Sequence, residues 1–355
     1  MAASPIAREL LELCVKQDAS DLHVTVGRPP VLRVHGRLVD VEGRPPLGAA
    51  DTEAFAHAIA PDRSWKEAGE VGTADFAVAH SPEARFRVSI YKQKGNWGAA
   101  CRLIPNRMLT LEELGLPDVV KELVTRPRGL LLVTGPTGSG KTTTLASMVS
   151  YLNQNFDRHI VTIEDPIEYY HQHDKSVIMQ RELHVDVPSF SEGMRRALRQ
   201  DPNVILLGEM RDLETISAAI TAAETGHLVL ATLHTTGAAR TVDRIIDAFP
   251  VEAQEQIRAQ LSVSLIAVIS QVLLPRADQR GRVAAFEIMI MTAAIENHIR
   301  KNETFKIPSA IQTSRRLGMV LLDDHLAELC RSGKIDRETA LRAAQSPKDL
   351  EPKLA

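Results

Sequence analysis

Residues 130–145 read LLLVTGPTGSGKTTTL, and this stretch decides the fold. An apolar run precedes Gly135, and a helix-forming segment begins at Lys141. The residues from Gly135 to Thr142 match the phosphate-binding pattern GxxxxGK[ST] in full. Glycines let backbone N–H groups turn toward phosphate oxygens, and the helix that follows points the positive end of its dipole at the same anion. The sequence therefore predicts a strand, a phosphate-binding loop and a helix.

The polar residues of this loop have distinct expected roles. Lys141 places a cation on the β and γ phosphates of a nucleotide, and the Thr142 hydroxyl is offered to Mg²⁺. We therefore expect ATP and Mg²⁺ as the ligands of the loop. The expected nucleotide-binding residues are Gly135, Pro136, Thr137, Gly138, Ser139, Gly140, Lys141, Thr142 and Thr143.

Short apolar runs follow the loop at intervals, each succeeded by polar or helix-prone sequence. They are HIVTIED at 159–165, VILLGEM at 204–210 and LVLATLH at 228–234. Buried strands that alternate with helices are typical of a parallel sheet covered on both faces. We expect an α/β core over residues 118–275 and, because we find no strand signal beyond it, a helical layer over residues 276–355.

The residues before the core have a different pattern. Residues 4–17 have helical spacing, and short alternating segments separated by Gly, Pro and Asn come after them, which indicates an antiparallel sheet. The segment 104–117 carries two prolines and a glycine and has the character of a linker. We predict an α+β domain over residues 1–103, with expected strands in 21–26, 30–39, 74–80, 84–93 and 98–104.

Composition restricts the class of protein. The 355 residues carry 42 Lys and Arg against 45 Asp and Glu, so the net charge of −3 offers no overall attraction to nucleic acid. The three cysteines, Cys14, Cys101 and Cys330, form no CxxC pair, so no zinc site is expected. The apolar stretch at 261–270 is too short to span a bilayer, and the N-terminus does not look like a signal peptide. A cytoplasmic location is the expectation.

Acidic residues end two of the predicted strands. Glu209 follows VILLG, and Glu164 and Asp165 follow IVTI. Because the carboxyl ends of parallel strands face the ligand crevice, we expect Glu209 to polarise the attacking water and to reach Mg²⁺ through water. Glu164 and Asp165 are expected to support the water or the metal. A lone acidic strand end would more simply be a cap or turn residue, but two such ends after a phosphate-binding loop favour catalysis.

Histidines and arginines complete the candidates. His227 and His234 lie at opposite ends of LVLATL, and His234 is the expected γ-phosphate sensor because it lies at the carboxyl end. A guanidinium would stabilise the charge that develops on the transferred phosphoryl group, although for any one arginine an ordinary surface role is the simpler interpretation. The arginine candidates are Arg85, Arg87, Arg102, Arg195, Arg196, Arg199 and Arg211.

Several segments together resemble the secretion-ATPase superfamily, and specifically the PilT-type retraction ATPases of type IV pili. They are GPTGSGKTTTL at 135–145, TIEDPIEYYH at 162–171, the run from LRQDPNVILLGEM to DRIIDAFP at 198–250, and GRVAAFEIMI at 281–290. In the terms of that family these contain the Walker A loop, the Asp box, the Walker B strand and the His box. The segment ASDLHVTVGRPPVLRVHGRL at 19–38 resembles the start of the family's PAS-like first domain.

The resemblance implies a RecA-like core and a homohexameric ring, in which the first domain of one subunit docks on the second domain of its neighbour and the nucleotide lies between the two domains. It implies that Glu164 is the Asp-box acid, that Glu209 is the Walker B acid, and that His227 and His234 form the His box. Two arginines of the first domain, Arg87 and Arg102, align with residues that reach the nucleotide in the family.

The function expected from the resemblance is a motor that pulls pilin subunits out of a pilus, as a peripheral protein that binds a platform protein at the cytoplasmic face of the inner membrane. Residues 294–301, AIENHIRK, depart from the family's AIRNLIRE motif. This departure leaves open an accessory paralogue with weak hydrolysis. A DNA-transport ATPase shares the core, but the acidic balance and the 4% aromatic content argue against it.

Overall fold

The computed structural model describes residues 5–34, 36–81, 84–104, 108–279 and 281–354. Contacts divide the chain into two units, Met1–Arg107 with Pro166–Tyr169, and Met108–Asp165 with Tyr170–Ala355. The division falls inside the segment 104–117 that we expected to be a linker. Residues 166–169 differ from the expectation, because they lie within the predicted core in sequence and yet belong to the first unit.

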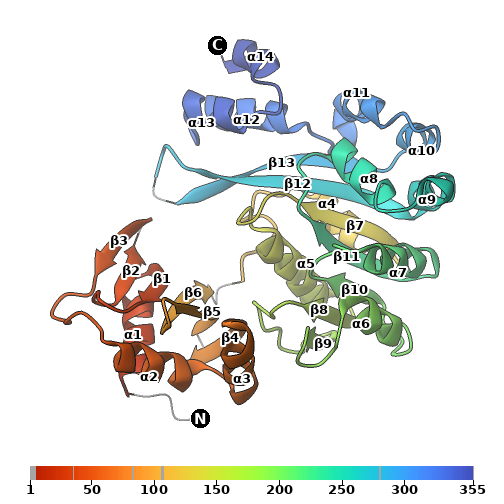
Figure 1. Cartoon of the computed structure of the whole chain (residues 1–355). Helices are drawn as coiled ribbons and strands as arrows, with labels where there is room; N and C mark the ends of the chain where they lie inside the picture. The colour runs from red at the N-terminus through yellow and green to blue at the C-terminus, as the bar shows by residue number, and fades with distance from the viewer. Residues whose placement is uncertain (1–4, 35, 82–83, 105–107, 280, 355) are drawn as a thin grey trace. The chain divides into compact units, whose positions relative to one another are not determined.

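The first unit is an antiparallel sheet with helices, as predicted (Figure 1). Its strand order is β3-β2-β1-β6-β5-β4. Large side chains such as Leu10, Leu22 and Phe86 are fully buried in its core. The helices are α1 (Pro5–Lys16), α2 (Ala49–Ile59) and α3 (Asp62–Val71), and the strands are β1 (Ala19–Val24), β2 (Val31–Val34), β3 (Arg37–Asp40), β4 (Thr73–Ser81), β5 (Ala84–Gln93) and β6 (Asn96–Ile104).

The second unit contains a largely parallel sheet in the order β13-β12-β7-β11-β10-β8-β9 (Figure 1). Every residue of β7, β10 and β11 is buried, which explains why these strands read as unbroken apolar runs. The strands are β7 (Gly129–Thr134), β8 (His159–Glu164), β9 (Val177–Glu182), β10 (Val204–Leu207), β11 (Leu228–Leu233), β12 (Leu265–Pro275) and β13 (Arg282–Ile290).

Helices connect these strands and extend beyond them. The first group is α4 (Val119–Val124), α5 (Lys141–Asn155), α6 (Phe190–Ala197), α7 (Leu213–Glu224), α8 (Ala238–Ile246) and α9 (Val251–Ser264). The second group follows β13 and comprises α10 (Ala293–Arg300), η1 (Thr304–Lys306), α11 (Ile307–Thr313), η2 (Arg315–Leu317), α12 (Leu322–Arg331), α13 (Arg337–Ala343), α14 (Pro347–Leu350) and η3 (Glu351–Leu354), where η marks a 3₁₀ helix. In the described ranges, no helix combines the length and the apolar character that a bilayer crossing requires.

The expectation of a purely helical chain after residue 276 is wrong for β13, which pairs antiparallel with β12. The last six residues of β13 are all buried, so the period of two that would mark a strand is absent. Helix α12 packs on β13. A short buried run of this kind cannot be told from a buried helix by periodicity alone.

Candidate nucleotide site

The phosphate-binding loop has the backbone that its glycines allow. Gly135, Gly138 and Gly140 have φ values of 142°, 78° and 90°. A Cβ at Gly135 would lie 2.2 Å from the backbone oxygen of Gln271 on β12, so the loop approaches that strand too closely for any side chain. The glycine at this position is thus required by both conformation and space.

Lys141 is the first residue of α5 and its side chain lies inside the loop. Its Nζ donates hydrogen bonds to the carbonyl oxygens of Gly135, at 2.9 Å, and Pro136, at 3.1 Å. The side chain is buried, so its charge is held where phosphate oxygens would meet it. Ser139 Oγ is buried and has no hydrogen-bond partner within the described part of the chain. An unsatisfied buried hydroxyl beside a held ammonium group fits a phosphate ligand.

Gln271 supports this loop from β12, a role that sequence reasoning missed. Its Nε2 donates to the carbonyl oxygen of Ser139 at 2.6 Å, and its Oε1 accepts from Thr144 Oγ1 at 2.9 Å. The Gln271 amide is buried and ties the loop to the first turn of α5. The signal in the sequence was the pair Ser270 and Gln271, which interrupts an otherwise apolar strand.

The sheet order brings the catalytic candidates to one edge. Strand β11 lies between β7, which carries the loop, and β10, which precedes Glu209; β8, which ends in Glu164, lies on the far side of β10. These strands are parallel, so their carboxyl ends lie at the same edge. His234 therefore follows the strand next to the loop, and Glu209 follows the next strand along.

Glu209 and His234 are in direct contact. His234 Nε2 lies 2.8 Å from Glu209 Oε1, and Arg211 Nε lies 2.6 Å from the same oxygen. The Glu209 side chain is 16% exposed, so it reaches solvent without being surrounded by it. The hydrogen bond and charge of Glu209 raise the pKa of Arg211, and the charge of Asp165 contributes. The structure thus brings Arg211 to the carboxylate expected to polarise water.

Glu164 is more deeply buried than Glu209. Its Oε1 accepts hydrogen bonds from Thr162 Oγ1 at 2.6 Å and from Gln180 Nε2 at 3.2 Å, and the residue is buried. A Cβ at Gly208 would lie 3.3 Å from the Glu164 Cα, so the glycine lets the ends of β8 and β10 approach closely. Asp165, by contrast, is exposed.

Three candidates lie away from this edge. His227 precedes β11, and its Nδ1 lies 3.1 Å from the carbonyl oxygen of Ala222. It is separated from His234 by the six residues of β11, about 20 Å of strand. Arg195 lies in the last turn of α6 and is exposed, whereas Arg199, which we expected on the same helix, lies beyond its end. Since α6 leads into the amino end of β10, neither arginine lies near the phosphate-binding loop of the chain.

The arginines of the first unit have different environments. Arg85 is buried, and its Nη1 donates to the carbonyl oxygen of Ile167 at 3.1 Å, which ties residues 166–169 to this unit. Arg102 Nε donates to Asp21 at 2.9 Å, and Arg87 Nη1 lies 3.8 Å from Glu168. Both Arg87 and Arg102 are substantially exposed, so they can meet a ligand, whereas Arg85 cannot.

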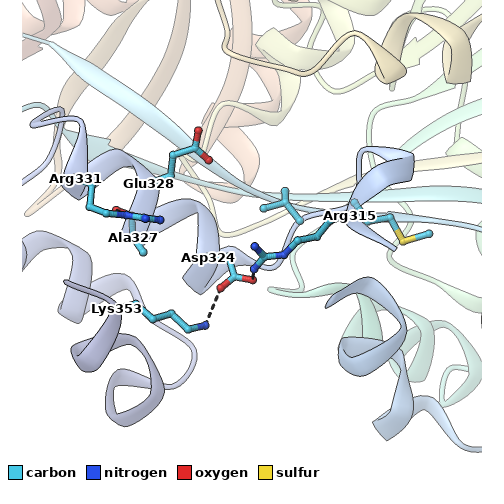
Figure 2. A pocket seen from close by; sticks show the side chains of 8 residues that line it. Arg315, Asp324, Ala327, Glu328, Arg331 and Lys353 are labelled. Carbon is cyan, nitrogen blue, oxygen red and sulfur yellow. Dashed lines mark hydrogen bonds and ion pairs between the residues drawn. The ribbon is translucent and has the colours of Figure 1, made fainter. Parts of the chain in front are cut away.

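A cavity of about 480 Å³ lies in the second unit, away from the phosphate-binding loop. Figure 2 shows Asp324 between Arg315 and Lys353, and it forms ion pairs with both. These ion pairs join η2, α12 and η3, so the charged residues of the cavity serve to hold these helices together. Its lining consists of Arg315, Met319, Val320, Asp324, Ala327, Glu328, Arg331 and Lys353.

Comparison with known proteins identifies the family of the chain. Residues 75–346 match the model of a family described as type II/IV secretion system protein. The chain is 50% identical to the type IV pilus retraction ATPase PilT of Pseudomonas aeruginosa over 96% of its own length and 99% of that protein. It is 39% identical to the type IV pilus ATPase PilU of the same organism, over 96% and 89% of the two chains.

The solved structure of the pilus retraction motor PilT with bound ADP superposes with a TM-score of 0.90 and 44% identity, covering 97% of this chain and 98% of that one. This match confirms the predicted α/β ATPase fold. The family model covers well over half of the sequence. The chain therefore belongs to the type II/IV secretion system protein family, whose ATPase fold it shares with PilT.

Proposed function

We propose that this chain is an ATP-hydrolysing motor that powers the retraction of type IV pili. The observation that carries the chemistry is the contact of Glu209 with His234 at 2.8 Å, one strand from a complete phosphate-binding loop. The identity of 50% with a retraction ATPase, along nearly the full length of both chains, supports the process that the chemistry serves. It exceeds the identity of 39% with PilU.

The residues of the loop bind and orient the nucleotide in this proposal. Lys141 gives up its bonds to the loop carbonyls and contacts the β and γ phosphates, while Ser139 Oγ and the N-terminus of α5 donate hydrogen bonds. Thr142 would hold Mg²⁺, Glu209 would reach it through water, and Asp165 is a weaker candidate. When bound, the metal neutralises phosphate charge.

Glu209 is the group that orients and polarises the attacking water. Its carboxylate is partly exposed, so water can reach it, and His234 and Arg211 fix its position. His234 lies between the loop and Glu209, where it can sense the γ phosphate. Glu164 is held by Thr162 and Gln180 and supports the water from the neighbouring strand.

Assembly is part of the proposal. In a homohexameric ring, Arg87 and Arg102 of the first unit would contact the nucleotide and stabilise charge on the transferred phosphoryl group. His227 and the exposed Arg195 and Arg199, which lie away from the loop of their own subunit, would then belong to contacts between subunits. The ring would act in the cytoplasm, peripheral to the inner membrane, on a platform protein and the pilin machinery, without direct binding of nucleic acid.

Steady-state ATPase measurements test the chemistry. We expect K141A and E209Q each to lose nearly all turnover, because one loses the phosphate cation and the other the water-polarising carboxylate. The matched control is Q154A, which removes an exposed amide from α5. Wild-type turnover as low as that of K141A would contradict an ATPase, and an E209Q variant with normal turnover would remove Glu209 from its role.

Deletion of the gene in its host tests the process. Loss of retraction predicts cells with excess pili and without twitching motility, restored by the wild-type gene and not by K141A. Normal piliation and motility after deletion would contradict the retraction motor.

The accessory paralogue is the second candidate, and helix α10 is the observation that favours it. Ile295 and Ile299 are buried there, while Glu296 and His298 within the helix and Lys301 at its C-cap give a charge pattern that differs from the family motif. The rescue experiment separates the two candidates. An accessory protein would restore motility even when it carries the K141A substitution, whereas a motor would not.

A further inference from the structure

We propose that Asp21 is a positioning residue for nucleotide turnover, which fixes Arg102 in a row of arginines that the first unit offers to phosphate groups. We call Arg33, Arg102 and Arg87 the arginine row. The inference rests on the proposed function, because it assumes that arginines of the first unit serve the nucleotide, and it adds the group that orients them.

The strand register places these residues side by side. Asp21 on β1 is opposite Arg33 on β2 and opposite Arg102 on β6. Arg102 is in turn opposite Arg87 on β5. Directly opposed residues of neighbouring strands project from the same face of a sheet, so the arginine row and Asp21 form one line across four strands.

Asp21 is the fixed point of this line. Its Oδ1 accepts from Arg102 Nε at 2.9 Å, its Oδ2 accepts from Ser20 Oγ at 2.8 Å, and Arg33 Nε lies 3.5 Å from Oδ2. The Asp21 side chain is only 8% exposed. Burial acts to raise the pKa of Asp21, but the hydrogen bonds from Ser20 and Arg102 lower it overall, so the carboxylate is charged. A buried anion with these partners holds a guanidinium far better than an exposed one does.

The guanidinium of Arg102 is bound at its Nε and free at its two terminal nitrogens among the described residues. Asp21 binds its Nε, and the terminal nitrogens of Arg102 make no hydrogen bond or ion pair with any residue that the structure describes. Its side chain is 69% exposed, in spite of the buried partner. A guanidinium fixed in this way presents two N–H groups in a planar fork, which suits bidentate binding of a phosphate.

The charge of the line favours an anionic ligand. Three arginines face two carboxylates, Asp21 and Glu168, so one positive charge is left over. Arg87 lies 3.8 Å from Glu168, a distance at which the pair is loose, and its side chain is 47% exposed. A polyphosphate could therefore engage Arg102 and Arg87 together without breaking the contact with Asp21.

The test is a double-mutant cycle on the full-length protein, with ATPase kcat and KM as the readout. We expect D21N to lower kcat about tenfold with little change in KM, because the asparagine is isosteric but no longer anchors the charged guanidinium. R102A should lower kcat at least as far. If Asp21 acts through Arg102, the D21N/R102A double variant is no slower than R102A alone.

The matched control is D40N. Asp40 and Arg28 form an Asp–Arg pair of the same length, 2.9 Å, on an exposed edge of the same sheet, outside the arginine row. D40N should leave kcat unchanged. D21E keeps the charge and should recover part of the activity that D21N loses, which a role in folding alone would not predict. Melting temperatures establish an assay temperature at which all variants are folded, and S20A, which loosens Asp21 without removing it, replaces D21N if that variant melts too low.

Two results would overturn the inference. One is a D21N variant, or S20A in its place, with the kcat of D40N. The other is a double variant whose losses multiply, which would mean that Asp21 and Arg102 act independently. Both outcomes are distinct from failure of the proposed function, because in that case K141A and E209Q would match the wild type as well.

Discussion

Gln271 lies on β12, outside the phosphate-binding loop, but its replacement by alanine should loosen that loop. Gln271→Ala removes the donor to the Ser139 carbonyl and the acceptor for the Thr144 hydroxyl, both buried. Each buried polar group left without a partner costs about 1–3 kcal/mol. The Thr144 hydroxyl can turn to the carbonyl oxygen of Gly140, just before α5, so most of the cost falls on Ser139. We expect a total loss of about 2–4 kcal/mol, including the buried methylene groups.

Part of that cost will appear in nucleotide binding. If the loop must be reordered when the ligand binds, about 1.4–2.8 kcal/mol is subtracted from the binding free energy, which weakens the affinity for ADP about 10- to 100-fold. Gln271→Glu should be equally harmful, because it keeps the acceptor for Thr144 but turns an oxygen toward the Ser139 carbonyl. Because Gln271→Glu keeps the volume of the side chain, comparison with Gln271→Ala separates the effect of losing the hydrogen-bond donor from the effect of losing side-chain volume.

Two measurements check this prediction. Calorimetric titration with ADP gives the affinity, and hydrogen exchange resolved over residues 136–155 gives the local stability of the loop and α5. Gln154→Ala, which removes an exposed amide from α5, serves as the control and should change neither. The reasoning is refuted if Gln271→Ala binds ADP as the control does and its loop exchanges no faster.

Three further predictions follow from single contacts. Gly135→Ala should abolish ADP binding because its Cβ would meet a backbone oxygen at 2.2 Å, whereas Gly138→Ala, with nothing within 4 Å of the new Cβ, should cost only the left-handed backbone penalty of about 1 kcal/mol in thermal unfolding. Burial lowers the pKa of His171 from 6.5 to about 4, so the folded state favours the neutral ring. Stability from this group is present above pH 6.5 and is lost as the pH falls toward about 4, and urea unfolding of His171→Gln should lack that part of the slope. Three groups donate hydrogen bonds to the Glu287 carboxylate, and Glu287→Gln would turn an N–H donor toward one of them. Urea unfolding at neutral pH should therefore show a free energy of unfolding that is lower by about 1–3 kcal/mol.

The loop and its neighbouring strands were predictable because their signals are local. The phosphate-binding pattern is contiguous, and the runs that became β8, β10 and β11 are buried on both faces, so their composition alone marks them. Glu209 and His234 were predictable for a further reason. The carboxyl ends of parallel strands share one edge, and that rule places both residues near the loop before their strand order is known.

The rest depended on register and strand order, which the residues do not encode locally. Asp21 lay at the start of an expected strand, 21–26, but was not a site candidate, because nothing in ASDLHV says which residue of a distant strand lies opposite. Gln271 was overlooked for the same reason: its partners at 139 and 144 lie more than a hundred residues away. His227 shows the opposite case, since proximity to His234 in sequence did not bring it to the site.

Glu287 shows how far such non-local order extends. This buried carboxylate on β13 accepts a hydrogen bond from the N–H of Ala238, the first residue of α8, and from the N–H of Leu322, the first residue of α12. Gln345 donates to it as well. Burial raises its pKa, and the three donors act against that rise. Because α8 begins four residues after His234, a change in the loop that carries His234 would pull on the same carboxylate that anchors α12. Helix α12 is thus connected to the nucleotide edge through this side chain, in a strand that the sequence did not reveal.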